Sequence, residues 1–179
     1  MGPMMRSLRL SRHRRANVWL DEPPPAGFTE TSVLTRTVKP SSAADATRPV
    51  VGIELTVPGG ARASYGLLGA ELIPADVEGL EIRVSVSKVG FPFRSSIAVH
   101  PDELLVGLPR EYGDAVLDGA SKIATTVGAP TNAALWFRWA AHGVVGSSPR
   151  IFEKISGVAL RLLMLPTDPL AEDIEAMLD

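Results

Sequence analysis

The sequence predicts an α+β domain: a two-layer sandwich with a mixed, four- to five-stranded sheet and two main helices on one face. Apolar and polar residues alternate in several segments between residues 50 and 107 and again over 133–140, which is the period of β-strands. Two further segments, beginning near residues 109 and 148, repeat apolar residues every three or four positions, as amphipathic helices do. Helices and a sheet of this kind bury their apolar sides against each other.

The overall composition is typical of a globular domain. The chain has 179 residues, of which 45% are hydrophobic and 21% are charged. It contains no cysteine, which excludes disulfides, thiolate zinc sites and a cysteine nucleophile. No apolar run approaches the roughly 18 residues of a membrane span, so we expect no membrane association and a cytoplasmic location. A net charge of −2 and a pI of about 5.9 argue against general polyanion binding by the whole surface.

Charge and composition divide the chain into three parts. Residues 1–48 are expected to be a flexible, partly basic segment, with five Arg and one His in residues 6–15 and three consecutive prolines at 23–25. The basic stretch is either a nucleic-acid arm or a solvated leader. Residues 28–38 favour one short strand within it. Residues 49–166 form the predicted domain, and residues 167–179, with five acidic and no basic residues, form an acidic tail.

The predicted strands follow one another from residue 50. The first is half-buried, because Val51, Ile53, Leu55 and Val57 alternate with Gly52, Glu54 and Thr56. A turn at 58–60 ends it. Residues 65–73 and 80–86 are the next strands, and the latter has the most regular alternation in the chain. Residues 95–99 and 104–107 are shorter strands or connections, and residues 133–140 are a strand.

Residues that are typical of helix ends mark the beginning and end of two predicted helices. Pro109 opens the first, since proline is favoured in a first turn, and Gly128 ends it. Ser147 or Ser148 caps the second, Pro149 occupies its first turn, and it ends at residue 166.

Three motifs carry a resemblance to a known family. Residues 60–66 (GARASYG) continue to Glu71 and Pro74, residues 108–112 (LPREY) are followed by Gly119, and residues 146–148 (GSS) precede Phe152. In this order, over about residues 50–165, they resemble domain IV of elongation factor G, which the ribosomal-protection tetracycline-resistance proteins share. The resemblance implies a fold like domain 2 of ribosomal protein S5, which includes a left-handed βαβ crossover, against the usual right-handed rule.

The chain also departs from this family. About 20 extra residues, 75–98, separate the first two motifs, and Ala61, Ser64 and Gly146 replace the family's Gly, Gln and Asp. The chain has no Gly-x-x-x-x-Gly-Lys-Ser/Thr phosphate loop, so GTPase activity is not carried over, and we expect neither a bound nucleotide nor a cofactor.

The resemblance implies which residues contact a partner. In the translation factors, loops at one end of the domain reach the ribosomal decoding site. The matching loops here are 60–64 and 140–145, so the RNA- or partner-binding candidates are Gly60, Arg62, Ser64 and His142. An arginine grips phosphate, and a histidine stacks on or hydrogen-bonds a base. We expect Arg62 and His142 to lie near each other; the alternative is that both are exposed without a partner.

Ser147 and Ser148 are anion-binding candidates, because the free N–H groups at a helix start attract anions. Residues 143–148 also resemble the phosphate loop of the small-molecule GHMP kinases, although Pro149 and Arg150 replace the small residues expected there. The histidines (His13, His100, His142) have no metal-ligand spacing, so no metal site is predicted. Trp136, Phe137 and Trp139 are interpreted as strand packing rather than as a base-stacking platform.

These observations predict a non-catalytic, translation-factor-like module that binds the ribosome, rRNA or a translation-associated protein. The first alternative is a protein–protein adaptor or degenerate paralogue without RNA binding, for which residues 89–93 offer an apolar surface. The remote alternative is a phosphate binder of the small-molecule kinase type.

Overall fold

The computed structural model describes residues 2–60, 62–98 and 103–179, with Arg62 described by its backbone alone. His100 therefore lies outside the described residues. The strands are β1 (Met4–Arg9), β2 (Arg15–Leu20), β3 (Ser32–Val38), β4 (Val50–Gly59), β5 (Arg62–Pro74), β6 (Leu80–Val86), β7 (Phe91–Pro92), β8 (Leu104–Val106) and β9 (Ala133–Gly143). The helices are α1 (Arg110–Thr126), α2 (Pro149–Met164) and α3 (Ala171–Leu178).

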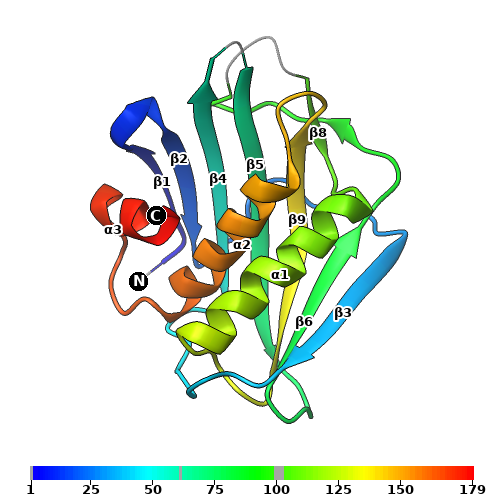
Figure 1. Ribbon diagram of the computed structural model, residues 1–179, viewed down its shortest axis with the longest axis vertical. Helices are drawn as coiled ribbons and strands as arrows, with labels where there is room; N and C mark the ends of the chain where they lie inside the picture. Colours follow the sequence, from blue (N-terminus) through cyan, green and yellow to red (C-terminus); the bar gives the residue numbers. More distant parts are fainter. Residues whose placement is uncertain (1, 61, 99–102) are drawn as a thin grey trace.

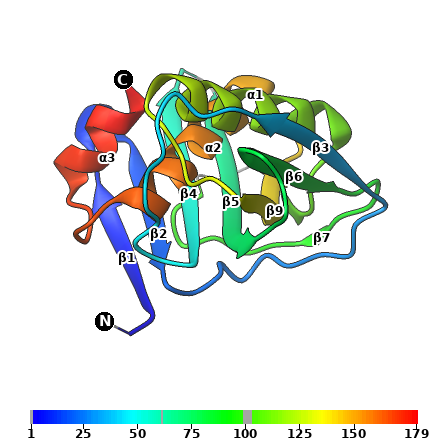
Figure 2. The ribbon, with the colours of Figure 1, turned by 90° about the horizontal axis from the view of Figure 1, so that it is seen from below.

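The fold is α+β, with one mixed sheet in the order β1-β2-β4-β5-β9-β6-β3. Neighbouring strands are antiparallel except β6 and β9, which are parallel. Strand β8 pairs with the end of β9, and β7 pairs with β8. The predicted helices α1 and α2 lie side by side on one face of this sheet (Figures 1 and 2). The sheet is larger than the four to five strands predicted, because strands from outside residues 49–166 join it.

The connection from β6 to β9 is left-handed. Both strands run up the page in Figure 1, α1 runs back down in front of the sheet, and β9 lies to the left of β6. A chain that rises behind, descends in front and rises again one strand to the left turns in a left-handed sense. Most parallel crossovers are right-handed. This connection agrees with the feature that the sequence resemblance implies.

The expectation of a flexible segment over residues 1–48 is wrong for most of its length. Strands β1 and β2 form a hairpin, and β2 pairs with β4 along its whole length. Ala16, Val18 and Leu20 of β2 are completely or almost completely buried. Strand β3 forms the opposite edge of the sheet, where it pairs with β6. The basic residues of the hairpin dominate its composition, but its alternating apolar residues complete the core.

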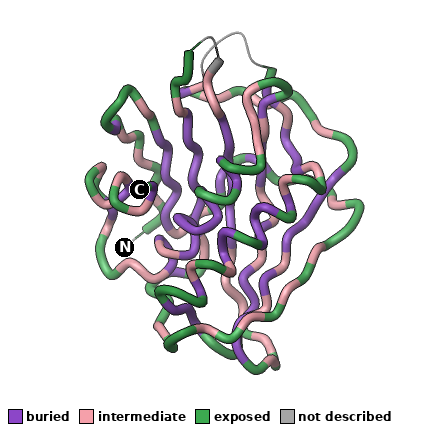
Figure 3. Tube along the Cα trace, viewed as in Figure 1, coloured by how far each residue is buried: buried purple, intermediate pink, exposed green. Residues whose placement is uncertain are grey.

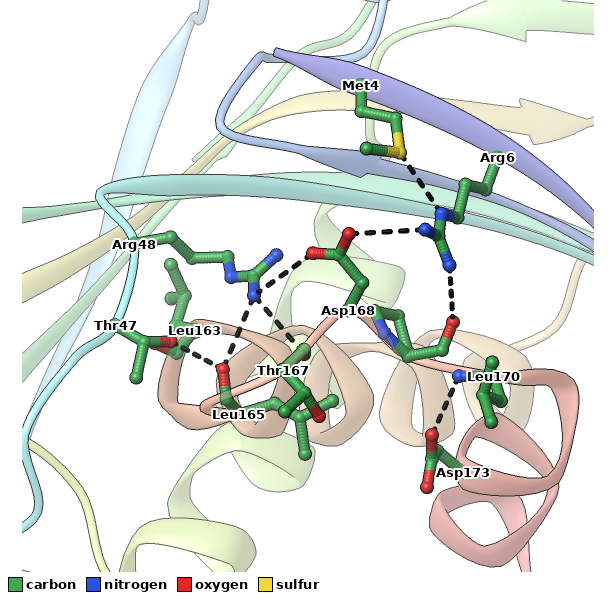
Figure 4. A network of polar contacts seen from close by, with 11 residues as sticks. Met4, Arg6, Thr47, Arg48, Leu163, Leu165, Thr167, Asp168, Leu170 and Asp173 are labelled. Atoms are coloured by element: carbon green, nitrogen blue, oxygen red, sulfur yellow. Dashed lines mark hydrogen bonds and ion pairs between the residues drawn. The ribbon is translucent and has the colours of Figure 1, made fainter. Parts of the chain in front are cut away.

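The expected acidic tail is also part of the folded structure. Ile174 and Leu178 of α3 are buried. Asp168 accepts a hydrogen bond from Arg6 at 3.2 Å, and one of its oxygens lies 3.9 Å from the guanidinium of Arg48 (Figure 4). The carboxylate thereby links β1, the segment before β4 and the segment before α3. Three parts of the chain that are distant in sequence are held together at this point.

The face of the sheet opposite α1 and α2 is also largely covered. The link between β2 and β3 crosses it, and Pro24 packs so closely on Gly52 and Gly69 that a Cβ at either position would overlap its ring. Residues 93–98 cover another part, where Ile97 is buried. Strand β4 is therefore buried on both sides rather than half-buried as predicted. Figure 3 shows buried residues running along the central strands and the inner sides of the helices.

Candidate functional site

The first part of the predicted site is the end of the β4–β5 hairpin. Gly60 has a φ of +61°, a left-handed conformation that glycine adopts without steric cost. The backbone of Arg62 pairs with Gly59, and the half-buried Ser64 pairs with Val57. The side chain of Arg62 lies outside what the structure describes. The hairpin therefore places Gly60 and Arg62 at the outermost end of two long strands.

A groove of about 290 Å³ lies beside this hairpin, where α2 begins. Its lining residues come from β4, β5 and the first turns of α2: Leu55, Val57, Ser64, Ser148, Arg150, Ile151 and Lys154. Two of these residues are cationic and none is acidic. The arrangement sets basic groups and hydroxyls around an apolar floor, a combination that suits a ligand with negative charge.

The start of α2 adds to this positive character. Ser148 is the N-cap residue, yet its hydroxyl makes no capping hydrogen bond, and Pro149 occupies the first turn. That turn contains no acidic residue. The exposed N–H groups and the partial positive charge of a helix start favour an anion. Ser148 remains an anion-binding candidate on this geometry.

Ser147, which was predicted to bind an anion, has hydrogen-bond partners within the fold. Its hydroxyl donates to the carbonyl oxygen of Tyr65 at 2.5 Å and accepts the N–H of Gly143 at 2.8 Å. The carbonyl oxygen of Ser147 accepts a hydrogen bond from the hydroxyl of Tyr112 at 3.1 Å. Ser147 thus ties β5, β9 and α1 together, and its hydroxyl proton is already used within the fold.

The prediction that His142 lies in a loop is wrong, because β9 continues to Gly143. The backbone of His142 pairs with Gly66 on β5 and with Leu105 on β8. Its Nδ1 lies 2.9 Å from the carbonyl oxygen of Gly107, and its ring stands edge-on to Tyr112 at 6.0 Å between centroids. A carbonyl oxygen can only accept, so Nδ1 donates the proton. His142 packs against α1, and its Nδ1 has a hydrogen-bond partner within the fold.

The strand pairing places the Arg62 backbone and His142 towards the same end of the sheet, but not in facing loops. His142 pairs with Gly66, and the Arg62 backbone lies roughly 13 Å further along β5 at 3.3 Å per residue. Glu71 is on the same strand as Arg62 but lies at its far end, where its carboxylate pairs with Arg138 at 2.7 Å. Of the four RNA-facing candidates, the structure keeps Gly60, Arg62 and Ser64 together and separates His142 from them.

Sequence reasoning missed a buried polar cluster on the opposite face of the sheet. The carboxylate of Glu54 accepts hydrogen bonds from Asn17 at 2.8 Å, from Tyr65 at 2.7 Å and from Ser95. Glu54 is 1% exposed. Burial, and then the charge of Glu54, raises the pKa of Tyr65, so the phenol stays protonated as a donor. The signal available in the sequence was one charged residue in the middle of an otherwise uncharged strand.

A second polar group on that face involves Trp136. The Arg138 guanidinium lies 4.4 Å from the centre of its ring, and the indole N–H donates to Ser85 at 2.9 Å. A bulge in β9 opposite Gly69 and Ala70 places Trp139 on this face with Arg138, whereas the alternation predicts the other face. Arg138 is paired with a carboxylate, so this group is better suited to holding strands together than to binding phosphate.

Within the described ranges, no three His, Cys, Asp or Glu side chains gather in a way that would hold a metal ion. No helix among the same residues is long and apolar enough to cross a membrane. Comparison of the chain with protein-family models, with curated proteins and with solved structures gave no match. The interpretation of the site therefore depends on its own geometry.

Proposed function

We propose that this chain is a non-catalytic module of the translation-factor type that binds RNA, with ribosomal RNA as the expected target. The site is the end of the β4–β5 hairpin together with the groove at the start of α2. The fold proposed for residues 49–166 is that of domain IV of elongation factor G, extended by the N-terminal hairpin, by β3 and by α3.

The observation that carries this proposal is that the three motifs meet in space. Tyr65 belongs to the first motif, Tyr112 to the second and Ser147 to the third, and hydrogen bonds link Ser147 to both tyrosines. Phe152, which follows the third motif, stacks on Tyr112 with 4.9 Å between ring centroids. Motifs that are distant in sequence but form one contact cluster support a common origin for the whole unit. The left-handed crossover supports the same fold.

The chemistry of the groove favours phosphate. Arg150 and Lys154 are exposed basic residues on successive turns of α2, and Ser64 and Ser148 offer hydroxyls beside them. An arginine guanidinium can hold two phosphate oxygens at once, and the helix start favours the same charge. The backbone of Arg62 lies at the end of the adjacent hairpin. Contacts of this kind position an RNA backbone without selecting its sequence.

The test is co-sedimentation with ribosomes at low and high salt. The double variant R150Q/K154Q is expected to lower the bound fraction about 10-fold at low salt, because two phosphate contacts are lost. It is also expected to flatten the dependence of log affinity on log salt by about two. The thermal midpoint should stay close to that of the parent, since both side chains are exposed.

The matched control is K39Q/K122Q. Lys39 and Lys122 are exposed. Lys39 directly follows β3 and Lys122 belongs to the last turns of α1, and Figure 1 shows these ends of β3 and α1 at the other end of the sheet from the start of α2. The variant makes the same change in net charge. It is expected to bind like the parent. Equal losses in the two variants would mean that only overall charge matters, and an absence of co-sedimentation at every salt concentration would remove the ribosome from the proposal.

A protein–protein adaptor remains the alternative, because Val89 and Phe91 are 74% and 62% exposed. These residues belong to the segment that the translation factors lack. A pull-down that recovers one protein in stoichiometric amount and no RNA, and that fails with F91S, would favour this alternative over RNA binding.

The kinase-like alternative has less support. Its phosphate loop would need a free serine at residue 147, whereas that hydroxyl is used within the fold. Calorimetry with ATP and magnesium is expected to detect no binding tighter than roughly millimolar.

A further inference from the structure

The turn between β1 and β2 carries a basic surface that the proposed site does not include. Arg9, Arg12, His13 and Arg15 are all exposed around this turn. Because β2 pairs with β4, with Arg15 opposite Thr56, the turn lies next to the end of the β4–β5 hairpin. Figure 1 shows both turns at the same end of the sheet. The basic residues therefore extend the RNA-facing end by the width of two strands.

The acidic helix α3 lies against this surface. The N–H of Ser11, in the turn, donates to the carboxylate of Glu175, and a carboxylate oxygen of Asp179 lies 3.9 Å from the guanidinium of Arg14. On its other side, the carbonyl oxygen of Leu178 accepts a hydrogen bond from Lys154 at 3.3 Å. The last turn of α3 is thus positioned between the basic turn and the groove at α2.

These polar contacts are weak, although the helix itself is well anchored. The Asp179 side chain is 76% exposed, and exposed ion pairs are strongly screened by water and salt. Anchoring comes instead from the buried Ile174 and Leu178. The carboxylates of Glu175 and Asp179 are therefore dispensable for packing, yet they lie against the basic turn, where Asp179 pairs with Arg14.

We propose that the β1–β2 turn is a second phosphate-contacting surface for RNA, continuous with the α2 groove, on which the carboxylates of α3 compete with RNA phosphates. This inference rests on the proposed function, because it takes RNA as the ligand. The basic groups of the turn and Lys154 of α2 lie on either side of the last turn of α3, and an extended chain of phosphates matches such a row better than a compact acidic patch does.

The experiment measures fluorescence anisotropy of a labelled single-stranded RNA of about 20 nucleotides, in low salt and over a salt series. The tail variant E172Q/E175Q/D179N removes three carboxylates of α3 and retains Asp173, whose carboxylate accepts the N–H of Leu170. Its affinity is expected to rise about 5- to 20-fold, with a steeper salt dependence than that of the parent.

The matched control is D45N/D76N/E78Q. These three acidic residues are exposed. Asp45 belongs to the link between β3 and β4, and Asp76 and Glu78 belong to the turn between β5 and β6. Figure 1 shows both segments at the end of the sheet opposite the β4–β5 turn. The net charge changes by the same amount. The control is expected to change affinity by less than about 2-fold, because charges beyond a Debye length are screened. Equal gains in the two variants would overturn the inference, since overall charge would then explain them.

Adding R9Q/R12Q/R15Q to the tail variant is expected to abolish the gain, and retention of the gain would overturn the inference. If R150Q/K154Q loses binding while the tail variant binds like the parent, the proposed function stands and this inference fails. If neither the parent nor the tail variant binds RNA, both fail. If the tail variant binds a polyglutamate peptide as tightly as RNA, the partner is an acidic protein and the RNA assignment is overturned.

Discussion

At the scale of single residues, the carboxylate of Glu54 organises the face of the sheet opposite α1 and α2. Donors come from β2, β5 and the segment that covers this face: Asn17, Tyr65 and Ser95. Ser95 also accepts the N–H groups of Ile97 and Ala98, so its hydroxyl links the covering segment to the sheet. A buried carboxylate without such donors would be costly. The cluster therefore holds residues 93–98 in place.

Tyr65→Phe is expected to lower the free energy of unfolding by about 1–3 kcal/mol at neutral pH, because the buried carboxylate loses one donor. It should also change the response to alkali. The raised pKa of Tyr65 means that, above about pH 10, the unfolded chain loses this proton while the folded chain keeps it. The tyrosine's contribution is thus complete below pH 10 and is lost as pH rises, by up to about 1.4 kcal/mol per unit.

Urea denaturation of the parent and of Tyr65→Phe at about pH 8 and about pH 11 measures this difference. Lys and Arg titrations are common to both proteins and cancel in the comparison. The variant should lose less stability than the parent between the two conditions. Equal losses would show that Tyr65 titrates normally in the folded protein.

At the scale of elements, α1 and α2 approach each other closely at two glycines. A Cβ on Gly119 of α1 would overlap the carbonyl oxygen of Glu153 and the hydroxyl of Ser156 on α2. A Cβ on Gly157 of α2 would lie 2.9 Å from Ile123 of α1. The two helices pack backbone to backbone here, and this close packing sets how they cover the sheet.

Gly119→Ala is expected to destabilise the protein by at least about 2 kcal/mol, because a backbone carbonyl cannot move aside as a flexible side chain can. Alanine is favoured over glycine in a helix by about 1 kcal/mol, so helix propensity alone predicts the opposite sign. Thermal or urea unfolding measures the change. Lys122→Ala, on the exposed side of the same helix, should stay within about 0.5 kcal/mol of the parent, and similar stability of both variants would contradict the close packing.

At the scale of the whole molecule, the ends of the chain complete the structure that the middle begins. Strand β2 covers the edge of β4, the link after β2 packs on the outer face of the sheet, and α3 packs against α2. Asp168, just before α3 in the chain, joins Arg6 and Arg48. The unit that folds is therefore larger than the segment that resembles the translation factors.

A fragment of residues 49–166 is expected not to unfold cooperatively, because it exposes the edge and one face of β4 and loses the apolar residues of β2. Circular dichroism during heating, with limited proteolysis, checks this. A chain beginning at residue 4 should give the same single transition as the full chain. A cooperative transition in the fragment would show that the N-terminal hairpin and α3 are additions to an independent domain.

The sequence by itself determined the local elements and most of their ends. Period-two and period-3.6 patterns, Gly60 in its turn and Pro149 at a helix start are properties of a few neighbouring residues, and the structure confirms the strands and helices they predict. The α+β class and the position of α1 and α2 on one face follow from those patterns.

Only the tertiary structure decided which segments join the sheet and which polar groups are buried. The basic composition of residues 6–15 gave no indication of strands β1 and β2. Strand β2 forms by pairing with β4, a segment that lies far along the chain. The residues that neighbour Glu54 and His142 in the sequence do not indicate which groups form hydrogen bonds with these two side chains. Partners of this kind come from distant strands, so the local periodicity of a sequence does not encode them. The tertiary structure places Gly60, Arg62, Ser64 and Ser148 around the hairpin end and the groove, whereas the side chains of Ser147 and His142 have partners within the fold.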